Sequence, residues 1–333
     1  MQQPRTFFQK ALIASTTLLA TLNTSAISQN EVNVYEGEIL TADHILAGEF
    51  NGQLFTLDST LMINLFEGGA LEQVGALPST PEGFLFDFNG ATINAFNGGL
   101  IMGTIFDSSY ITNSTMNLYI GGRTGADVIV EGNMTVNLLG GLFGVHGNLQ
   151  EGTTINMSLG RISTDQIGSR AMLNMSGGVI PQGISGGFNV YHISGGCVGP
   201  SILNFGTELN LYVRDIAVNS TPLELAKGES VSITPTTDLM MVATLANGQP
   251  YLFDAQSGRD GLNTNITITA TQMETCSADL NGDGKTDFFD ISIYVQAFQT
   301  TPTVGEYDCN AMGSNNDFFD VSAFIDAFGD GCN

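Results

Sequence analysis

Basic side chains are scarce in this chain. Among 333 residues there are nine Lys or Arg against 33 Asp or Glu, and the formal net charge is −24. Proteins that bind nucleic acid or anionic polysaccharide use clustered Lys and Arg to displace counterions. The charge balance therefore argues against both classes of partner, and it suits a calcium-rich, saline exterior.

Tryptophan is absent, and the three histidines lie far apart at positions 44, 146 and 192. A Ser-His-Asp arrangement for nucleophilic catalysis cannot be defended from residues scattered in this way. Glycine, in contrast, is abundant, with 41 residues. This composition fits strands and turns better than it fits a helical enzyme.

Long apolar runs are also lacking, apart from ALIASTTLLATL at 11–22. Arg5 and Lys10 precede this run, and the small residues Thr24 and Ala26 follow it, which predicts a secretory signal peptide over 1–26. No other segment approaches the roughly 20 apolar residues of a membrane span. We therefore expect a secreted, extracellular or cell-surface protein without a transmembrane anchor after cleavage. Seven basic and 33 acidic residues would remain, a net charge of −26.

The body of the chain repeats one motif, in which two apolar residues flank an asparagine and a glycine-rich turn usually follows. The eight copies are MINLFEGG (Asn64), TINAFNGG (Asn94), TMNLYIGG (Asn117), TVNLLGG (Asn137), TINMSLG (Asn156), MLNMSGG (Asn174), VYHISGG (His192) and ELNLYV (Asn210). Their spacings are 30, 23, 20, 19, 18, 18 and 18 residues. A short period that converges in this way predicts a solenoid.

The alternation within the motif selects the kind of solenoid. The two apolar residues share one face of a strand and the asparagine takes the other. A coil with a single apolar face must stack on its neighbours to bury that face. The glycine pairs lie where the chain must turn through backbone angles that side chains resist. We therefore predict a mainly β fold, a right-handed parallel β-helix with β caps.

Domain boundaries follow from where the motif stops. We predict the β-helix over 31–219, with 31–58 as its N-terminal cap, 59–112 as irregular coils and 77–84 as a loop. A C-terminal β cap over 220–271 contains a hairpin at 239–255 with Asn247-Gly248 as its turn, and a strand at 265–271. Capping both ends would cover open strand edges, which otherwise invite aggregation.

The repeated asparagines allow two interpretations. Stacked amides can form a structural ladder from coil to coil, with His192 as a substitute in one coil. Alternatively, the asparagines and His192 form polar contacts of a glycan-binding stripe. Asn113, Asn133, Asn156, Asn174, Asn219 and Asn265 match glycosylation sequons, although the motif itself generates two of these.

Catalysis would need paired carboxylates, or Arg beside acidic residues. The candidates are Arg123 with Asp127, Arg161 with Asp165, and Arg170. Arg123 and Arg161 follow the motif at similar offsets, so they could lie near each other on one face. Neighbouring coils place Leu142 and Val179 at comparable positions, however, so surface Arg–Asp pairs are the favoured interpretation.

A calcium loop is predicted near the C-terminus, in ADLNGDGKTDFFD (278–290). Such a loop needs oxygen ligands at positions 1, 3, 5, 7, 9 and 12 and glycine at position 6. The ligands would be Asp279, Asn281, Asp283, the carbonyl of Lys285, Asp287 and Asp290, with Gly284 at the sharp turn. We expect this loop to bind Ca²⁺.

A second, imperfect copy follows in DCNAMGSNNDFFD (308–320). It is one residue too long, and Met312 stands where a carboxylate is needed. Only Asp308, Asn310, Asp317 and Asp320 could contribute, so this loop would bind calcium weakly or not at all. Apolar residues at helical spacing follow both loops, at 291–298 and 321–328, and predict two helices that pack together.

This duplicated loop and helix resembles a type I dockerin, in the variant that ends in Gly331-Cys332. The resemblance implies a small α-helical, EF-hand-like calcium-binding module over 274–333, with two antiparallel helices. It also implies a cohesin-like or cell-envelope partner. Hydroxyl residues usual at the recognition positions are replaced by Phe288, Phe289, Phe318 and Phe319, which would form an apolar docking patch.

Four cysteines fit an oxidising exterior. The antiparallel helices implied by the resemblance favour a Cys276–Cys332 disulfide that joins the two ends of the module. Cys197 and Cys309 lie in different domains and are either free or linked to each other. Two functions remain open: a secreted, non-catalytic structural or adhesive β-helix protein attached through its terminal module, and a polysaccharide-binding or polysaccharide-degrading component of a dockerin–cohesin complex.

Overall fold

A computed structural model describes most of the region between the predicted signal peptide and the terminal module. The described residues are 30–72, 84–102, 109–125, 128–144, 148–149, 151–163, 170–263 and 265–273, with Phe288 and Ile291 singly. The predicted signal peptide lies outside them, as does the terminal module apart from those two residues. Within the described part, no helix is both long enough and apolar enough to cross a membrane.

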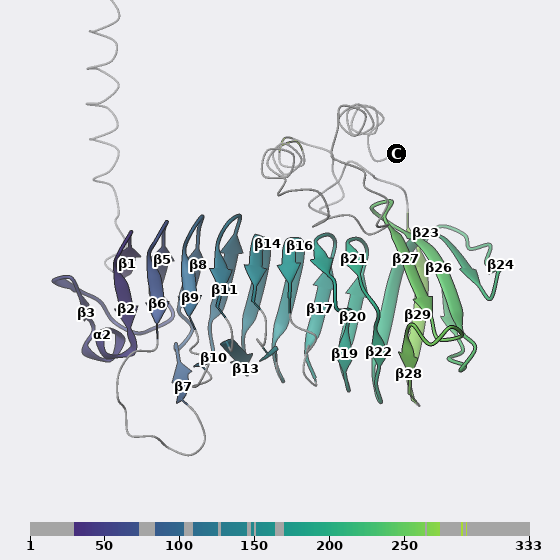
Figure 1. The fold of residues 1–333 in the computed structure, drawn as a ribbon, viewed down its shortest axis with the longest axis horizontal. Helices are drawn as coiled ribbons and strands as arrows, with labels where there is room; N and C mark the ends of the chain where they lie inside the picture. The colour runs from purple at the N-terminus through teal and green to yellow at the C-terminus, as the bar shows by residue number, and fades with distance from the viewer. Residues whose placement is uncertain are drawn as a thin grey trace, which may run out of the picture.

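Parallel strands form a continuous row along the length of the molecule (Figure 1). In order of stacking they are β1 (Glu31–Val34), β5 (Met62–Leu65), β8 (Thr92–Ala95), β11 (Thr115–Tyr119), β14 (Thr135–Phe143), β16 (Thr154–Ile162), β17 (Met172–Met175), β20 (Val190–Ile193), β23 (Glu208–Val218) and β29 (Thr267–Gln272). We call the region from Glu31 to Gln272 the coil stack. Its mainly β, mostly parallel character confirms that part of the prediction and is compatible with a β-helix.

Further strands pair on other sides of the coils. A second parallel row contains β2 (Ile39–Thr41), β6 (Ala70–Glu72), β9 (Leu100–Met102), β12 (Arg123–Thr124), the ends of β14 and β16, β18 (Val179–Ile180) and β21 (Cys197–Val198). A third side carries two shorter parallel groups. They are β7 (Phe84–Asp87), β10 (Ser109–Thr112), β13 (Val128–Glu131) and β15 (Asn148–Leu149), and then β19 (Ser185–Gly186), β22 (Ile202–Leu203) and β28 (Gly261–Leu262).

The core lies inside the coils and is built from the apolar residues of the motif. On the two sides of each central asparagine, alternate residues point inward. Those preceding the asparagine or its equivalent are at most 1 % exposed: Val32, Ile63, Ile93, Met116, Val136, Ile155, Leu173, Tyr191, Leu209 and Ile268. Because each coil adds such a pair, the core runs the length of the stack, and each coil is stabilised by its neighbours.

The glycine pairs serve two purposes, as Gly98 and Gly99 illustrate. Gly98 has a φ of 78°, the left-handed region in which glycine is favoured. Gly99 is needed for close approach, because a Cβ at this position would lie 2.3 Å from the carbonyl oxygen of Leu65 in the preceding coil. The prediction that turn angles explain both glycines is therefore wrong for the second.

The first coil begins earlier than the repeat indicated. Asn33 in β1 pairs in register with Asn64 in β5, so a coil with the central asparagine lies within the segment predicted as a cap. Next to it come α2 (Ala42–Ala47) and the short hairpin β3 (Glu49–Phe50) and β4 (Gln53–Leu54). Thr41 caps α2 through the His44 N–H, His44 Nδ1 in turn accepts from the Thr41 N–H, and Gly48 ends the helix in the left-handed conformation. No helix was predicted here.

Antiparallel strands cover the last coil. β24 (Thr221–Pro222) and β26 (Met240–Leu245) pair with the far half of β23, and β25 (Ser230–Ile233) pairs with β29. β26 and β27 (Pro250–Asp254) form the predicted hairpin, with Asn247-Gly248 at its turn. The predicted strand at 265–271 corresponds to β29, which adds one more parallel strand to the stack beside β23.

Candidate functional site

Asparagine side chains form a hydrogen-bonded row along the coil stack, which we call the amide ladder. In each step the Nδ2 group of one asparagine donates to Oδ1 of the asparagine in the preceding coil. The pairs are Asn64 to Asn33 (2.9 Å), Asn94 to Asn64 (2.8 Å), Asn117 to Asn94 (2.7 Å), Asn137 to Asn117 (2.7 Å), Asn156 to Asn137 (2.9 Å) and Asn174 to Asn156 (2.9 Å). The ladder predicted from the repeat is present, and Asn33 extends it by one member.

The ladder changes character after Asn174. In register, His192 takes the place of asparagine in β20, Asn210 follows in β23 and Thr269 in β29. The ring of His192 contacts that of Tyr212, with 3.3 Å between His192 Nδ1 and the Tyr212 hydroxyl oxygen. His192 therefore occupies the asparagine position of its coil, in register with Asn174 and Asn210, as the structural interpretation predicted.

Substitution at the centre of the ladder should destabilise the stack modestly. Asn137 both donates to Asn117 and accepts from Asn156, so Asn137→Ala leaves one acceptor and one donor without their partner. The expected loss in the free energy of unfolding is about 1–2 kcal/mol, the contribution of two partly exposed hydrogen bonds. Urea denaturation followed by far-ultraviolet circular dichroism would measure it. Exposed Asn133→Ala is the control, and equal effects of both substitutions would contradict the prediction.

A second row lies two positions after the ladder on the same outward face, and we call it the ring row. Its first members, Tyr35, Phe66, Phe96 and Tyr119, stack with their ring centroids 4.8–5.2 Å apart and their planes within 10° of parallel. Leu139 follows. Then the row has serine in three successive coils, Ser158, Ser176 and Ser194, before Tyr212 restores an aromatic ring. Three successive coils therefore lack a large side chain in this row.

The interruption produces a groove of about 420 Å³. Its lining residues are Leu139, Asn156, Met157, Ser158, Asn174, Met175, Ser176, His192, Ser194 and Tyr212. The serines lie between Leu139 at one end and Tyr212 at the other, and ladder residues run alongside. At about 4.8 Å per coil, the four steps between the ends span about 19 Å. We refer to this feature as the groove.

The turn of the β26–β27 hairpin packs against the coils that form the groove. The Asn247 side-chain amide donates to the Ser176 carbonyl oxygen at 3.2 Å, and the Asn247 N–H donates to the Ser194 carbonyl oxygen at 3.1 Å. The Gly196 N–H donates to the Gln249 side chain. The C-terminal closure of the stack therefore also fixes the backbone of two of the three serine coils.

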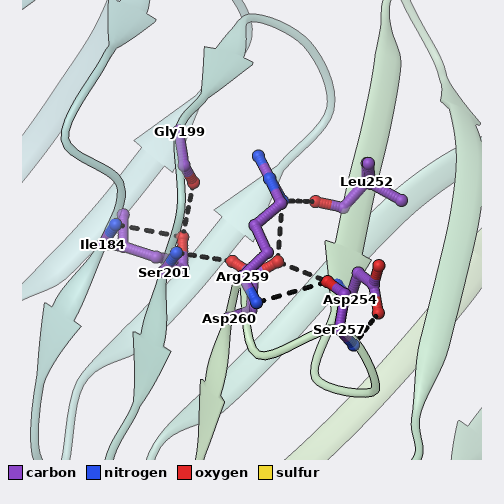
Figure 2. A network of polar contacts seen from close by, with 8 residues as sticks. All are labelled: Ile184, Gly199, Ser201, Leu252, Asp254, Ser257, Arg259 and Asp260. Carbon is purple, nitrogen blue, oxygen red and sulfur yellow. Dashed lines mark hydrogen bonds and ion pairs between the residues drawn. The ribbon is translucent and has the colours of Figure 1, made fainter.

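A buried carboxylate connects the other end of this hairpin to the coils (Figure 2). Asp260 is 5 % exposed, and it accepts hydrogen bonds from the Ser201 N–H at 2.5 Å and the Asp254 N–H at 2.8 Å. Asp260 also forms an ion pair with Arg259, whose Nη1 lies 2.7 Å from Asp260 Oδ2. The same Nη1 group donates to the Leu252 carbonyl oxygen. One side chain thus joins strand β27, the loop after it and the coil at Ser201.

The loop before Asp260 is also ordered by a carboxylate. Asp254 accepts from the Ser257 N–H at 2.9 Å, and hydrogen bonding with Ser257 holds the pKa of Asp254 below its ordinary value. The Ser201 hydroxyl donates to the Gly199 carbonyl oxygen and accepts from the Ile184 N–H. These contacts continue the network of Figure 2 into the neighbouring coil.

The arginines considered for catalysis do not assemble a site with the described residues. Register places Arg123, Leu142 and Arg161 in one row, so the two arginines lie two coils apart with a leucine between them. Arg170 forms an exposed ion pair with Glu151 at 2.8 Å. Asp127, Asp165 and His146 lie outside the described residues. In the described ranges, no three His, Cys, Asp or Glu side chains are grouped closely enough to hold a metal ion.

The predicted calcium ligands all lie outside the described residues. These are Asp279, Asn281, Asp283, Lys285, Asp287 and Asp290, with Asp308, Asn310, Asp317 and Asp320 of the second copy. The same holds for Cys276, Cys309, Cys332, Phe289, Phe318 and Phe319. Phe288 is described, in a helical conformation with 73 % of its surface exposed. Cys197 is disulfide-bonded, which excludes the alternative that it is free.

Five of the six sequon asparagines, all except the exposed Asn133, fall into two groups in the structure. Asn156 and Asn174 have their amides in the ladder, so their sequons coincide with the repeat. Asn113, Asn219 and Asn265 have φ values of 56°, 49° and 58°, in the left-handed region that asparagine tolerates at turns. These three residues therefore have a conformational explanation that does not require glycosylation.

Comparison with known proteins gives little resemblance. No family model matches the chain, and no curated protein matches it. Among solved structures, the chain is similar to one described as "Crystal structure of TibC-catalyzed hyper-glycosylated TibA55-350 fragment", with a TM-score of 0.33 and 14% sequence identity. The similarity covers 55% of this chain and 65% of that one, slightly less than two thirds of its length.

Proposed function

We propose that this chain is a secreted, non-catalytic structural or adhesive protein. Its body is a right-handed parallel β-helix, and its terminal residues 274–333, which we call the tail, are a small helical dockerin-like module. The tail binds Ca²⁺ through its first loop and attaches the body to a cohesin-like or cell-envelope partner. The single observation that supports the non-catalytic body is the unbroken amide ladder from Asn33 to Asn174.

The ladder supports this function because the polar face that a β-helix would use for chemistry is occupied by structural hydrogen bonds. Each ladder amide from Asn64 to Asn156 uses one donor and its acceptor within the row. General acid–base catalysis on a glycosidic bond needs a pair of carboxyl groups at a suitable separation. Only two carboxylates occur among the described outward residues within two positions of the ladder. Glu31 lies in the first strand of the row, hydrogen-bonded to Asn64, and Glu208 lies in the ninth, so they cannot form such a pair.

Incubation of the full chain without its signal peptide with neutral and acidic plant and algal polysaccharides tests the non-catalytic assignment. We expect no release of reducing ends and no absorbance from unsaturated sugars. Heat-denatured protein serves as the control for trace activity in the preparation. Release that is lost on denaturation would contradict the proposal and favour the second candidate, a polysaccharide-degrading component.

Calcium-dependent capture tests the tail. The complete ligand set from Asp279 to Asp290 leads us to expect that Asp283→Ala abolishes high-affinity calcium binding measured by calorimetry. Metal binding of this kind is coupled to folding, so the variant should also lose capture of its partner from native cell envelope, as chelator-treated wild type should. Asp308→Ala in the imperfect second copy is the matched control. Identical calcium titrations for wild type and Asp283→Ala would refute the assignment.

A further inference from the structure

We propose that the groove between Leu139 and Tyr212 binds a neutral oligosaccharide, with one sugar ring over each serine coil. This inference deepens the proposed function, because it names the ligand class of the adhesive body. Its basis is the interruption of the ring row, which leaves a groove of about 420 Å³, within the usual range for small-ligand sites of about 300–1,000 Å³. The groove is elongated along the stack, so it suits a chain of rings.

The groove offers the two kinds of contact that a sugar needs. Serine hydroxyls and ladder amides both donate and accept hydrogen bonds, and they recur once per coil at a spacing of about 4.8 Å. A sugar chain also repeats its hydroxyl groups at the spacing of its rings. A ligand with one ring per coil would therefore meet a serine hydroxyl in each of the coils of Ser158, Ser176 and Ser194. A ladder amide lies beside the first two serines and His192 beside the third.

Tyr212 provides an apolar surface at one end. In the N-terminal half of the ring row, neighbouring rings such as Phe66 and Phe96 cover each other at 5.2 Å. The row position preceding Tyr212 is Ser194, which has no ring to stack on it. The tyrosine contacts His192 instead, with ring centroids 6.2 Å apart and a tilt of 32°. The apolar face of a sugar ring can pack against an aromatic side chain with a polar tip, as Tyr has.

Charge selects a neutral ligand. None of the groove-lining residues is acidic, Lys or Arg, and the whole chain carries a net charge of −24. An anionic sugar would be repelled by this field and would find no cation in the groove. The uncharged lining is also mixed in polarity: Leu139, Met157 and Met175 lie beside the serine hydroxyls and the ladder amides, and the exposed surface is mainly apolar. It therefore suits a ligand that has both apolar faces and hydroxyl groups, as a neutral sugar has.

Filling the groove tests the proposal. Calorimetric titration of the full chain without its signal peptide should detect binding of at least one of cello-, manno-, xylo- and laminaritetraose, and none of tetragalacturonate. Ser176→Phe places in the central serine coil a ring of the kind that occupies the same row at Phe66 and Phe96. We expect the fold to be retained and the affinity to fall about tenfold or more.

The matched control is Met172→Phe, which adds the same ring to the same coil at the start of β17, outside the groove, where Met172 is 39 % exposed. It should bind like wild type. If Ser176→Phe fails to fold by circular dichroism, Tyr212→Ala replaces it, and the same loss of affinity is expected.

Three results would overturn the inference: no binding of any neutral tetrasaccharide, preferential binding of the acidic one, or equal affinity in the filled variant. A fourth is self-association in sedimentation velocity that the phenylalanine abolishes, which would assign the groove to a second copy of this chain. None of these results bears on the calcium-dependent capture by the tail or on the polysaccharide-cleavage assay. Failure of the groove proposal is thus distinguishable from failure of the proposed function.

Discussion

Replacing Tyr191 with alanine should lower the free energy of unfolding of the coil stack by about 3–5 kcal/mol, the range for large aromatic-to-alanine changes in a core. Tyr191 is 0 % exposed and is among the largest fully buried side chains. It occupies the inward position of the motif in β20, one residue before His192. The change would leave a cavity between coils that cannot move closer, because their backbones are paired on both sides.

The hydroxyl group of Tyr191 adds a polar component to this loss. It accepts from the Asn189 side-chain amide at 2.7 Å and donates to the Ser185 carbonyl oxygen at 3.1 Å. Burial raises the pKa of the Tyr191 phenol well above its ordinary value, so it remains a donor at physiological pH. Tyr191→Phe keeps the ring and removes both of these hydrogen bonds, while the Asn189 amide still lies 3.5 Å from the Ser185 carbonyl oxygen. The expected cost is about 1–3 kcal/mol.

Urea denaturation of the three proteins, with Phe205→Ala as an exposed aromatic control, would measure both effects. Phe205 is 46 % exposed, so its replacement should change stability little. Similar losses for Tyr191→Ala and Phe205→Ala would contradict the packing argument. A Tyr191→Phe variant as unstable as Tyr191→Ala would mean that the hydrogen bonds, and not the ring, carry the effect.

Removal of the buried carboxylate of Asp260 is the second large expected effect. Its side chain is 1 % exposed, whereas that of Arg259 is 29 % exposed. Asp260→Ala leaves the guanidinium of Arg259 and the N–H groups of Ser201 and Asp254 without this acceptor. The loss from breaking a buried pair on one side is about 3–5 kcal/mol. Because Arg259 is partly hydrated, we expect a value near the lower end.

The exposed pair Arg170–Glu151 provides a matched control within the same chain. The two side chains are 60% and 67% exposed, and such surface pairs contribute about 0–1 kcal/mol. Glu151→Ala should therefore have little effect. The stability loss of Asp260→Asn should fall between those of Asp260→Ala and Glu151→Ala. Asparagine keeps the shape of the side chain, but its N–H₂ group would face a donor where the carboxylate accepted a hydrogen bond. Thermal unfolding that ranks Glu151→Ala as the most damaging of the three would refute this account.

The repeat made the coil stack predictable, and the reason is physical. An alternating apolar–asparagine–apolar triplet can satisfy its inward side chains only against another coil, so the register of Asn64 with Asn94 and Asn117 follows from the motif itself. Asn33 was missed because VNVYEGE lacks the glycine pair. Helix α2 was missed because it is only six residues long, with its signal confined to Thr41, His44 and Gly48.

The groove could not be predicted in the same way. A serine by itself does not indicate a binding site in a sequence. Ser158, Ser176 and Ser194 stand out only because they lack the aromatic ring that Phe66 and Tyr119 have at the same position of the row. The difference matters once coils are aligned at the ladder and the positions two residues later are compared. The burial of Asp260 beside Arg259 also has no signal in the sequence, because two adjacent charged residues in a turn are usually exposed.

The hydrogen bonds between the ladder amides all point the same way along the stack. If one amide were rotated by half a turn, its oxygen would face another oxygen on one side and its N–H₂ group would face another N–H₂ group on the other. The orientation of any one asparagine therefore determines that of all the rest, as in a line of aligned dipoles. The two ends of the row are chemically different: Asn33 accepts from Asn64 at the first end, and at the other end Asn174 donates to Asn156 and is followed in register by His192. Such a row gives the body a polarity that a second copy placed end to end in the opposite sense could not continue.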